Sequence, residues 1–201
     1  MEAVAVTAST MQRVAIFLVC LLSSALALPT PARLWSKGNG PIIGGSSANI
    51  ANYQWQLSFQ YGGGASSTSV SGSLLGTSAR VVTLASDNYD PPGGLAVTVT
   101  GWGATYTDGL SISSMLNVNI SILDRNTCRN TFANINTVTD RMVCAGQAGK
   151  SVCNGDSGGP LVSGSTQVGI ISWGSSSCEA TPGVFANVGN LRSWIRSASG
   201  V

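Results

Sequence analysis

The segment Cys153–Leu161 reads CNGDSGGPL and has the composition of a tight turn that presents a reactive serine. Ser157 is flanked by glycines at positions 155, 158 and 159, which would let a substrate backbone approach closely. A serine attacks a carbonyl carbon efficiently only when a base takes its proton, and histidine is the usual base. The chain contains no histidine. The sequence therefore predicts a nucleophile without the group that would activate it.

Two other interpretations of this segment are possible. Residues 155–159 fit the loose G-x-S-x-G pattern of α/β-hydrolases, in which the serine lies on a strand-to-helix turn. No helical pattern follows Gly158, which disfavours that fold. The segment would otherwise be a glycine-rich hairpin without a chemical role. Motifs elsewhere in the chain argue against both interpretations.

CNGDSGGPL resembles the active-serine signature of the trypsin/chymotrypsin family of serine proteases. Further segments resemble the same family, in family order and with near-family spacing: Ile42–Gly45 (IIGG), Gly101–Gly103 (GWG), Met142–Gly146 (MVCAG), Ser172–Gly174 (SWG) and Pro182–Phe185 (PGVF). The resemblance extends from Ile42 to the C-terminus with one internal gap. It implies an all-β fold of two six-stranded barrels with the site between them. It also implies a secreted serine endopeptidase lineage, with no cofactor.

The resemblance implies a role for each residue of the serine turn. Ser157 would be the nucleophile, and the backbone N–H groups of Gly155 and Ser157 would form the oxyanion hole. Asp156 would form a buried ion pair with the new amino group of Ile42 once the propeptide of the zymogen is cut.

A substrate pocket is implied as well. Ser151 would form its base, and Gly174 and Gly183 would form its walls. Ser172, Trp173 and Gly174 would pair with the substrate backbone as an added strand. Glycine walls and an uncharged base resemble the pocket of chymotrypsin, which suits a large apolar or aromatic side chain. The expected partner is thus a polypeptide substrate or a protease inhibitor.

The histidine and the aspartate of the family's catalytic triad have no counterpart here. The family has Ala-Ala-His-Cys directly after a run like Gly72–Thr83, whereas here Leu84-Ala85-Ser86 follows and resembles sequence far downstream. We expect an internal deletion near residues 83–84. It would leave the N-terminal barrel with roughly three strands, too few to close. Asp87 and Asp90 are interpreted as turn residues and not as replacements for the missing aspartate.

The deletion has two expected consequences. Loss of the histidine alone lowers kcat by on the order of 10⁶ in a comparable triad enzyme, so this chain should be at best very weakly active. The open N-terminal barrel would expose strand edges and apolar surface unless something covers them.

Two positions depart from the family outside the gap. Pro41 precedes Ile42, where the family usually has Arg or Lys. A trypsin-like activator could cut at Arg33 or Lys37, but neither cut frees Ile42, so the expected ion pair would not form. Val70 lies where the family often has a cysteine, and the partner of that cysteine, beside the missing histidine, is absent too.

The N-terminus predicts export from the cell. Arg13, the apolar run Val14–Leu22 and an A-x-A site before residue 28 form a secretory signal peptide, residues 1–27. Met11 is an alternative start, and a buried helix is the competing interpretation of the run, which is too short to span a membrane. Residues 28–41, rich in Pro, Gly and polar residues, are expected to be a propeptide, and residues 42–201 the protease domain. The mature protein is expected to be extracellular and monomeric.

Charge and cysteine content narrow the function classes. Only 9% of residues are charged, and the basic excess belongs to residues 1–41, so no nucleic-acid partner is expected. Five cysteines become four when Cys20 leaves with the signal peptide, which predicts two disulfides. Metal binding competes with that interpretation, but the chain has no Cys-x-x-Cys pair and no histidine. The resemblance pairs Cys128 with Cys144 and Cys153 with Cys178.

Short alternating runs between Gly- and Pro-rich turns predict an all-β domain. The expected strands are Gln54–Tyr61, Gly72–Leu84, Ala96–Trp102, Leu116–Leu123, Leu161–Val162 and Val168–Trp173. Only Leu191–Ser197 has a helical pattern. The C-terminal barrel, from Ala96 to about Val188, should be complete. Asn119-Ile120-Ser121 is an N-glycosylation sequon in an expected strand.

Three hypotheses follow from the sequence. The chain is an incomplete or spliced version of a chymotrypsin-like endopeptidase, or a non-catalytic homologue that acts as a binding module, or a non-functional product that misfolds.

Overall fold

The computed structural model describes residues 42–61, 64–69 and 80–200. The expected signal peptide and propeptide, Val70 and most of the expected strand Gly72–Leu84 lie outside these residues. Within the described residues, no helix combines the length and the apolar character that crossing a membrane requires.

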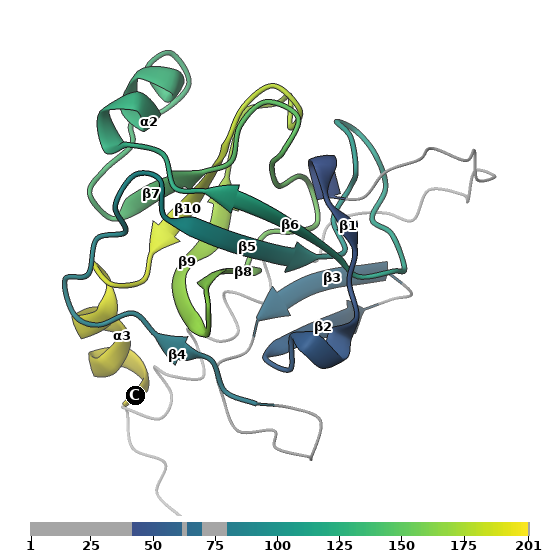
Figure 1. Cartoon of the computed structure of the whole chain (residues 1–201), viewed down its shortest axis with the longest axis horizontal. Coiled ribbons are helices and arrows are strands. Elements are labelled where there is room, and N and C mark those ends of the chain that lie inside the picture. The colour runs from purple at the N-terminus through teal and green to yellow at the C-terminus, as the bar shows by residue number, and fades with distance from the viewer. Residues whose placement is uncertain (1–41, 62–63, 70–79, 201) are drawn as a thin grey trace, which may run out of the picture. The chain divides into compact units, whose positions relative to one another are not determined.

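The described chain is mainly β-structure (Figure 1), which confirms the predicted all-β class. The strands are β1 (Ser46–Ser47), β2 (Gln56–Tyr61), β3 (Gly64–Ser69), β4 (Thr83–Leu84), β5 (Ala96–Gly101), β6 (Leu116–Ser121), β7 (Met142–Ala145), β8 (Pro160–Ser163), β9 (Thr166–Trp173) and β10 (Gly183–Asn187). The helical segments are η1 (Ile42–Gly44), η2 (Ile50–Asn52), α2 (Arg125–Phe132) and α3 (Arg192–Ser199).

Six of these strands form a ring of antiparallel neighbours in the order β6-β5-β8-β9-β10-β7. The ring closes between the residues that follow β6 and the last residues of β7. There Ile122 forms an antiparallel bridge with Ala145, and the Leu123 backbone N–H donates to the Cys144 carbonyl at 2.8 Å. Closure leaves these strands without a long free edge. The C-terminal part of the chain is thus a closed six-stranded barrel.

Alternating side chains fill the barrel interior. In β6, Leu116, Val118 and Ile120 are buried, whereas Asn119 and Ser121 face outward. A Cβ atom on Gly169 of β9 would lie 3.0 Å from Leu161 and 3.1 Å from Phe185, so glycine makes room there for large core side chains. Phe185 is fully buried in this core.

The strands that precede Ala96 pair differently. β2 and β3 form a two-stranded antiparallel hairpin, while β1 pairs with β6 and β4 pairs in parallel with β9. Gln56, at the start of β2, is tied to the C-terminal barrel, because the buried Thr100 hydroxyl donates to its side-chain oxygen at 2.7 Å. Among the described residues, no second closed barrel is formed.

The expectation of a single helix was wrong. The helix near the C-terminus is present as α3, but α2 was missed because it lacks an apolar stripe: only Cys128 and Phe132 are buried in it. Its start is fixed by Asp124, whose carboxylate accepts hydrogen bonds from the backbone N–H groups of Asn126 at 2.9 Å and Thr127 at 3.1 Å. This N-cap satisfies donors that the first turn leaves unpaired.

We expect Asp124→Ala to lower the free energy of unfolding by about 1 kcal/mol, because two N–H groups of α2 lose their acceptor. Chemical denaturation monitored by circular dichroism measures this change. Asp140→Ala is the matched control, since the Asp140 carboxylate is 74% exposed and pairs only with Arg129. An equal loss of stability in both variants would contradict the capping role.

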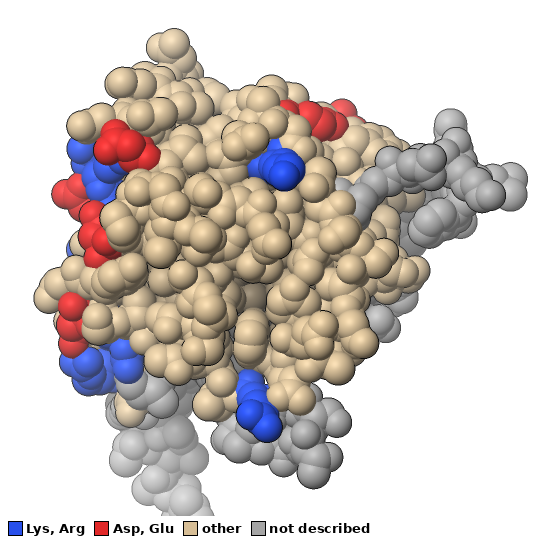
Figure 2. All heavy atoms as spheres, viewed as in Figure 1, with Lys and Arg blue, Asp and Glu red and all other residues tan. Residues whose placement is uncertain are grey.

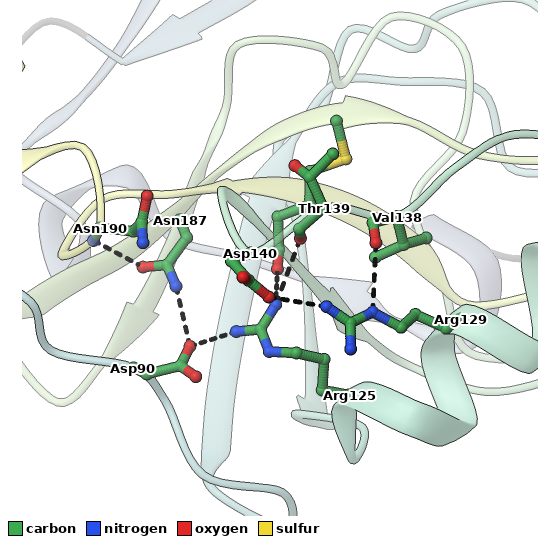
Figure 3. Close-up of polar contacts among 9 residues, drawn as sticks. Asp90, Arg125, Arg129, Val138, Thr139, Asp140, Asn187 and Asn190 are labelled. Atoms are coloured by element: carbon green, nitrogen blue, oxygen red, sulfur yellow. Dashed lines mark hydrogen bonds and ion pairs between the residues drawn. The ribbon is translucent and has the colours of Figure 1, made fainter.

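Asp90 lies in the segment that connects β4 to β5, in a polar network that also includes residues of α2 and β10 (Figure 3). Its carboxylate pairs with Arg125 and accepts from the side-chain amide of the buried Asn187 at 2.9 Å. Asp87 is likewise engaged by Arg196 at 2.7 Å, and this bond, with one from Ser193, lowers the Asp87 pKa. Both aspartates therefore anchor the segment that enters the barrel.

Charged side chains are sparse on the face shown in Figure 2, where blue and red groups lie beside one another along one edge. Most of this face is uncharged. It carries no broad basic surface of the kind that binds nucleic acid.

Candidate active site

The turn that carries Ser157 is built from short-range backbone hydrogen bonds. The Asp156 N–H donates to the Cys153 carbonyl at 3.1 Å, and the Gly159 N–H donates to the Asp156 carbonyl at 2.9 Å. The Gly158 N–H donates to Ile171 of β9 at 2.9 Å, which fixes the turn to the barrel. Gly155 and Gly158 have φ values of 94° and 83°, a region that glycine adopts without strain. Ser157 is left exposed at the surface.

Ser157 lines a pocket of about 70 Å³ together with all the residues that the resemblance assigns to substrate binding: Ser151, Ser172, Trp173, Gly174 and Gly183. Ser151 is 1% exposed, as suits a pocket base. No charged residue is among those that line the pocket. Its volume is below the ~300–1,000 Å³ of typical ligand pockets, so it fits one side chain better than a whole small molecule.

The pocket wall at Gly183 needs a residue without a side chain. A Cβ atom on Gly183 would lie 2.5 Å from a Val152 methyl group, which is closer than carbon atoms can approach. Trp173 is half-buried and packs edge-on against Phe132 of α2, with ring centroids 5.0 Å apart. Packing against α2 holds the end of β9 in place beside the pocket.

Some residues of this pocket were not predicted from the sequence, among them two with polar side chains. Ser175 and Thr181 line it, and their hydroxyl groups share a hydrogen bond of 2.7 Å. Their positions offered a signal, since Ser175 directly follows SWG and Thr181 directly precedes PGVF.

Both disulfides implied by the resemblance are present. Cys153–Cys178 joins the serine turn to the opposite wall of the pocket, with a Cα–Cα distance of 5.3 Å. Cys128–Cys144 joins α2 to β7, with a Cα–Cα distance of 5.8 Å. By loop entropy each contributes roughly 3 kcal/mol to stability.

Asp156 is fully buried next to the exposed serine. Its carboxylate accepts from the backbone N–H groups of Gly103 at 2.8 Å and Cys153 at 3.1 Å. Burial raises the Asp156 pKa to about 6, against the opposing effect of these two bonds. The ion pairs within the described residues do not include Asp156. In the uncut chain, two N–H donors therefore solvate the carboxylate that was expected to pair with the amino group of Ile42.

The raised pKa predicts a pH dependence of stability. The folded chain binds the Asp156 proton more tightly than the unfolded chain, so the stabilisation is fully present below the ordinary pKa near 3.8 and is lost as pH rises through about 6. The shift corresponds to about 3 kcal/mol. We expect Asp156→Asn to remove this contribution, so that the variant gains stability relative to the wild-type chain between pH 4 and pH 7. Urea unfolding of both proteins across this range measures the difference, and a constant difference would contradict the buried charge.

The pocket offers the serine no base. Its lining residues include no Asp, Glu or Lys, the two cysteines in it form a disulfide, and the sequence has no histidine. Among the described residues, no group of His, Cys, Asp or Glu side chains could hold a metal ion. The arrangement places an exposed serine hydroxyl beside an uncharged pocket whose lining supplies no group to take its proton.

Residues 69–195 match the family model described as Trypsin. This chain belongs to the trypsin family of serine proteases. Trypsin delta of Drosophila erecta is 43% identical over 119 residues, a match that covers 58% of this chain and 46% of the relative. Trypsin alpha-4 of Lucilia cuprina is 30% identical over 248 residues, covering 92% of this chain and 97% of the relative. The chain thus spans about half the length of the first relatives that it matches.

Two solved structures are similar to this trypsin-family chain. Neuropsin, a serine protease expressed in the limbic system of mouse brain, is 34% identical with a TM-score of 0.56. An inactivated protease paralogue of the scabies mite is 31% identical with the same TM-score of 0.56. Each match covers 61% of this chain and 55% of the other chain.

Proposed function

We propose that this chain is a secreted member of a serine endopeptidase lineage that binds polypeptide segments without cleaving them efficiently. One observation carries the proposal: Ser157 lines an uncharged pocket with the substrate-binding residues of the family, while the sequence contains no histidine. The pocket would accept one large apolar or aromatic side chain of a substrate-like segment or a protease inhibitor.

The proposed binding follows from the geometry at the end of β9. Ser172 is exposed at this position, so a polypeptide can pair with the backbone of Ser172–Gly174 as an added strand. One side chain of the bound segment then enters between Gly174 and Gly183, above Ser151. The N–H groups of Gly155 and Ser157 would polarise the carbonyl next to it. Ser157 keeps its proton because no base is present, and the complex stays unreacted.

The proposed domain organisation is a signal peptide (1–27), a propeptide (28–41) and a trypsin-like domain (42–201) with an internal deletion near residues 83–84. The match to trypsin alpha-4 supports the deletion, because it extends over 248 positions whereas this chain has 201 residues. Asn119 is exposed on β6, and its glycosylation remains a prediction.

Gly183→Val is expected to weaken binding of an aromatic side chain at least tenfold, because the added methyl groups would occupy the pocket beside Val152. Isothermal titration of the secreted protein with two peptides that differ only in phenylalanine or alanine at one position measures both affinity and preference. Ser113→Val is the control, since Ser113 is exposed and outside the pocket lining. Equal affinity for the two peptides would contradict the proposed function.

The alternative is that an active endopeptidase is the parent and this chain is an incomplete version of it. The 30% identity along nearly the whole of trypsin alpha-4 favours this alternative. Sequencing of transcripts across the Thr83–Leu84 junction distinguishes the incomplete enzyme from the non-catalytic protein. Reads with an inserted segment that encodes a histidine would support the parent enzyme, and uninterrupted reads would support the non-catalytic protein.

A further inference from the structure

The loops around the pocket are joined to one another in the uncut chain. Ile43 packs in a buried cluster with Ala104, Cys153 and Cys178, which come from three separate loops. The Ser151 N–H donates to the Ile43 carbonyl at 3.2 Å, so the pocket base is attached to the segment that follows the expected cleavage site. Ile42 is itself fully buried.

Glu179 connects two of these loops through its carboxylate and a third segment through its backbone carbonyl. Glu179 accepts the Thr107 backbone N–H at 2.6 Å with one oxygen and the Thr107 hydroxyl with the other. The Thr107 hydroxyl oxygen in turn accepts the Cys178 N–H at 3.0 Å, and the Glu179 carbonyl accepts the Gly149 N–H at 2.8 Å. Glu179 is only half-buried, and the bonds from Thr107 lower its pKa.

These bonds lie next to the pocket. Cys178 lines it and is the neighbour of Glu179, while Gly149 lies two residues before the pocket base. The loop of Thr107 also contacts the other half of the pocket disulfide, where the Cys153 sulfur lies 3.6 Å from the Tyr106 carbonyl oxygen. Hydrogen bonds to a charged acceptor are stronger than neutral ones, so the Glu179 carboxylate can fix the loop of Thr107 against the loop of Cys178.

We propose that Glu179 is a positioning residue that holds the substrate pocket in its binding arrangement without any cut before Ile42. The inference rests on the proposed binding function and names the residue that keeps the pocket formed. The ion pair implied by the family resemblance is not needed for this, because Asp156 already has two N–H donors and Pro41 blocks a trypsin-like cut.

The first test uses the full secreted chain, shown by mass to be uncut at Pro41–Ile42, with N-acetyl-L-phenylalanine amide as the probe. We expect Glu179→Ala to weaken binding about tenfold, since the two bonds from Thr107 are lost, and Glu179→Gln to have an intermediate effect because one acceptor oxygen remains. Asp140→Ala should bind like wild type, because its carboxylate pairs with Arg129 outside the pocket. Equal binding by the Glu179 variants and wild type would overturn the inference.

Hydrogen exchange gives a readout that a general loss of stability would not reproduce. Glu179→Ala should speed amide exchange at Thr107 and Cys178, with barrel amides such as Leu123 unchanged. Uniformly faster exchange in the barrel as well would overturn the positioning role.

A cleavable variant separates this inference from the proposed function. Pro41→Lys followed by limited tryptic digestion frees the Ile42 amino group, and N-terminal sequencing verifies the cut. We expect the cut and uncut forms to bind the probe with affinities within about threefold of each other. Binding by the cut form alone would overturn the inference and leave the proposed function in place. Absence of binding by both forms would overturn the proposed function, and with it the inference.

Discussion

Purified chain is expected to hydrolyse a chromogenic peptide with phenylalanine at the scissile bond no faster than its Ser157→Ala variant. Loss of the histidine from a triad lowers kcat by on the order of 10⁶, which brings turnover to the level of the buffer background in an ordinary assay. The serine, its turn and its pocket are in place, so the expected low rate follows from the missing base and its missing aspartate partner and not from a misplaced nucleophile. The assay compares both proteins at equal concentration and at pH 8.

Trace contamination by a host protease is controlled by the same pair of proteins. A contaminant gives equal rates in both preparations, whereas a reaction at Ser157 appears only in the wild-type chain. Faster hydrolysis by wild type than by Ser157→Ala, retained through repeated purification, would contradict the account.

Phe185→Ala should destabilise the barrel by about 3–5 kcal/mol, because it removes a fully buried ring and leaves a cavity between rigid strands. Total stabilities of domains are about 5–15 kcal/mol, so the yield of folded variant should fall sharply. Trp194→Ala is the control, since this ring is 67% exposed on α3 and makes a large aromatic change outside the core. Urea unfolding and the yield in culture medium measure both effects. Similar losses in the two variants would contradict a closed, tightly packed C-terminal barrel.

Much of this architecture could be predicted because its residues carry local signals. The runs that became β5, β6 and β9 alternate or remain apolar between clear turns, and the burial of Leu116, Val118 and Ile120 follows that alternation. The pocket residues could be predicted because each family motif forms one segment of the pocket wall. A single motif does not show that these segments lie next to one another. The closed barrel brings them to the same place.

The rest depended on contacts that span long stretches of sequence. α2 has a polar surface and is held by Asp124, a disulfide and Phe132, so periodicity gave no signal. The hydrogen bonds between Thr107 and Glu179 join residues 72 positions apart, and no local sequence pattern predicts them. The helical pattern of Leu191–Ser197 was confirmed as α3, but within it Trp194 is exposed while Ile195 packs against the core. A helical pattern identifies the apolar residues of a helix but not which of them a neighbouring element covers.

We propose that this trypsin-family chain retains a formed serine turn and pocket but cannot activate the serine. Labelling of the purified secreted protein with a serine-directed fluorophosphonate tests this most directly, with active trypsin as the positive control and Ser157→Ala as the negative one. We expect complete labelling of trypsin and no labelling of this chain above that of its Ser157→Ala variant. Stoichiometric labelling at Ser157, located by mass spectrometry of the peptide that contains it, would contradict the account.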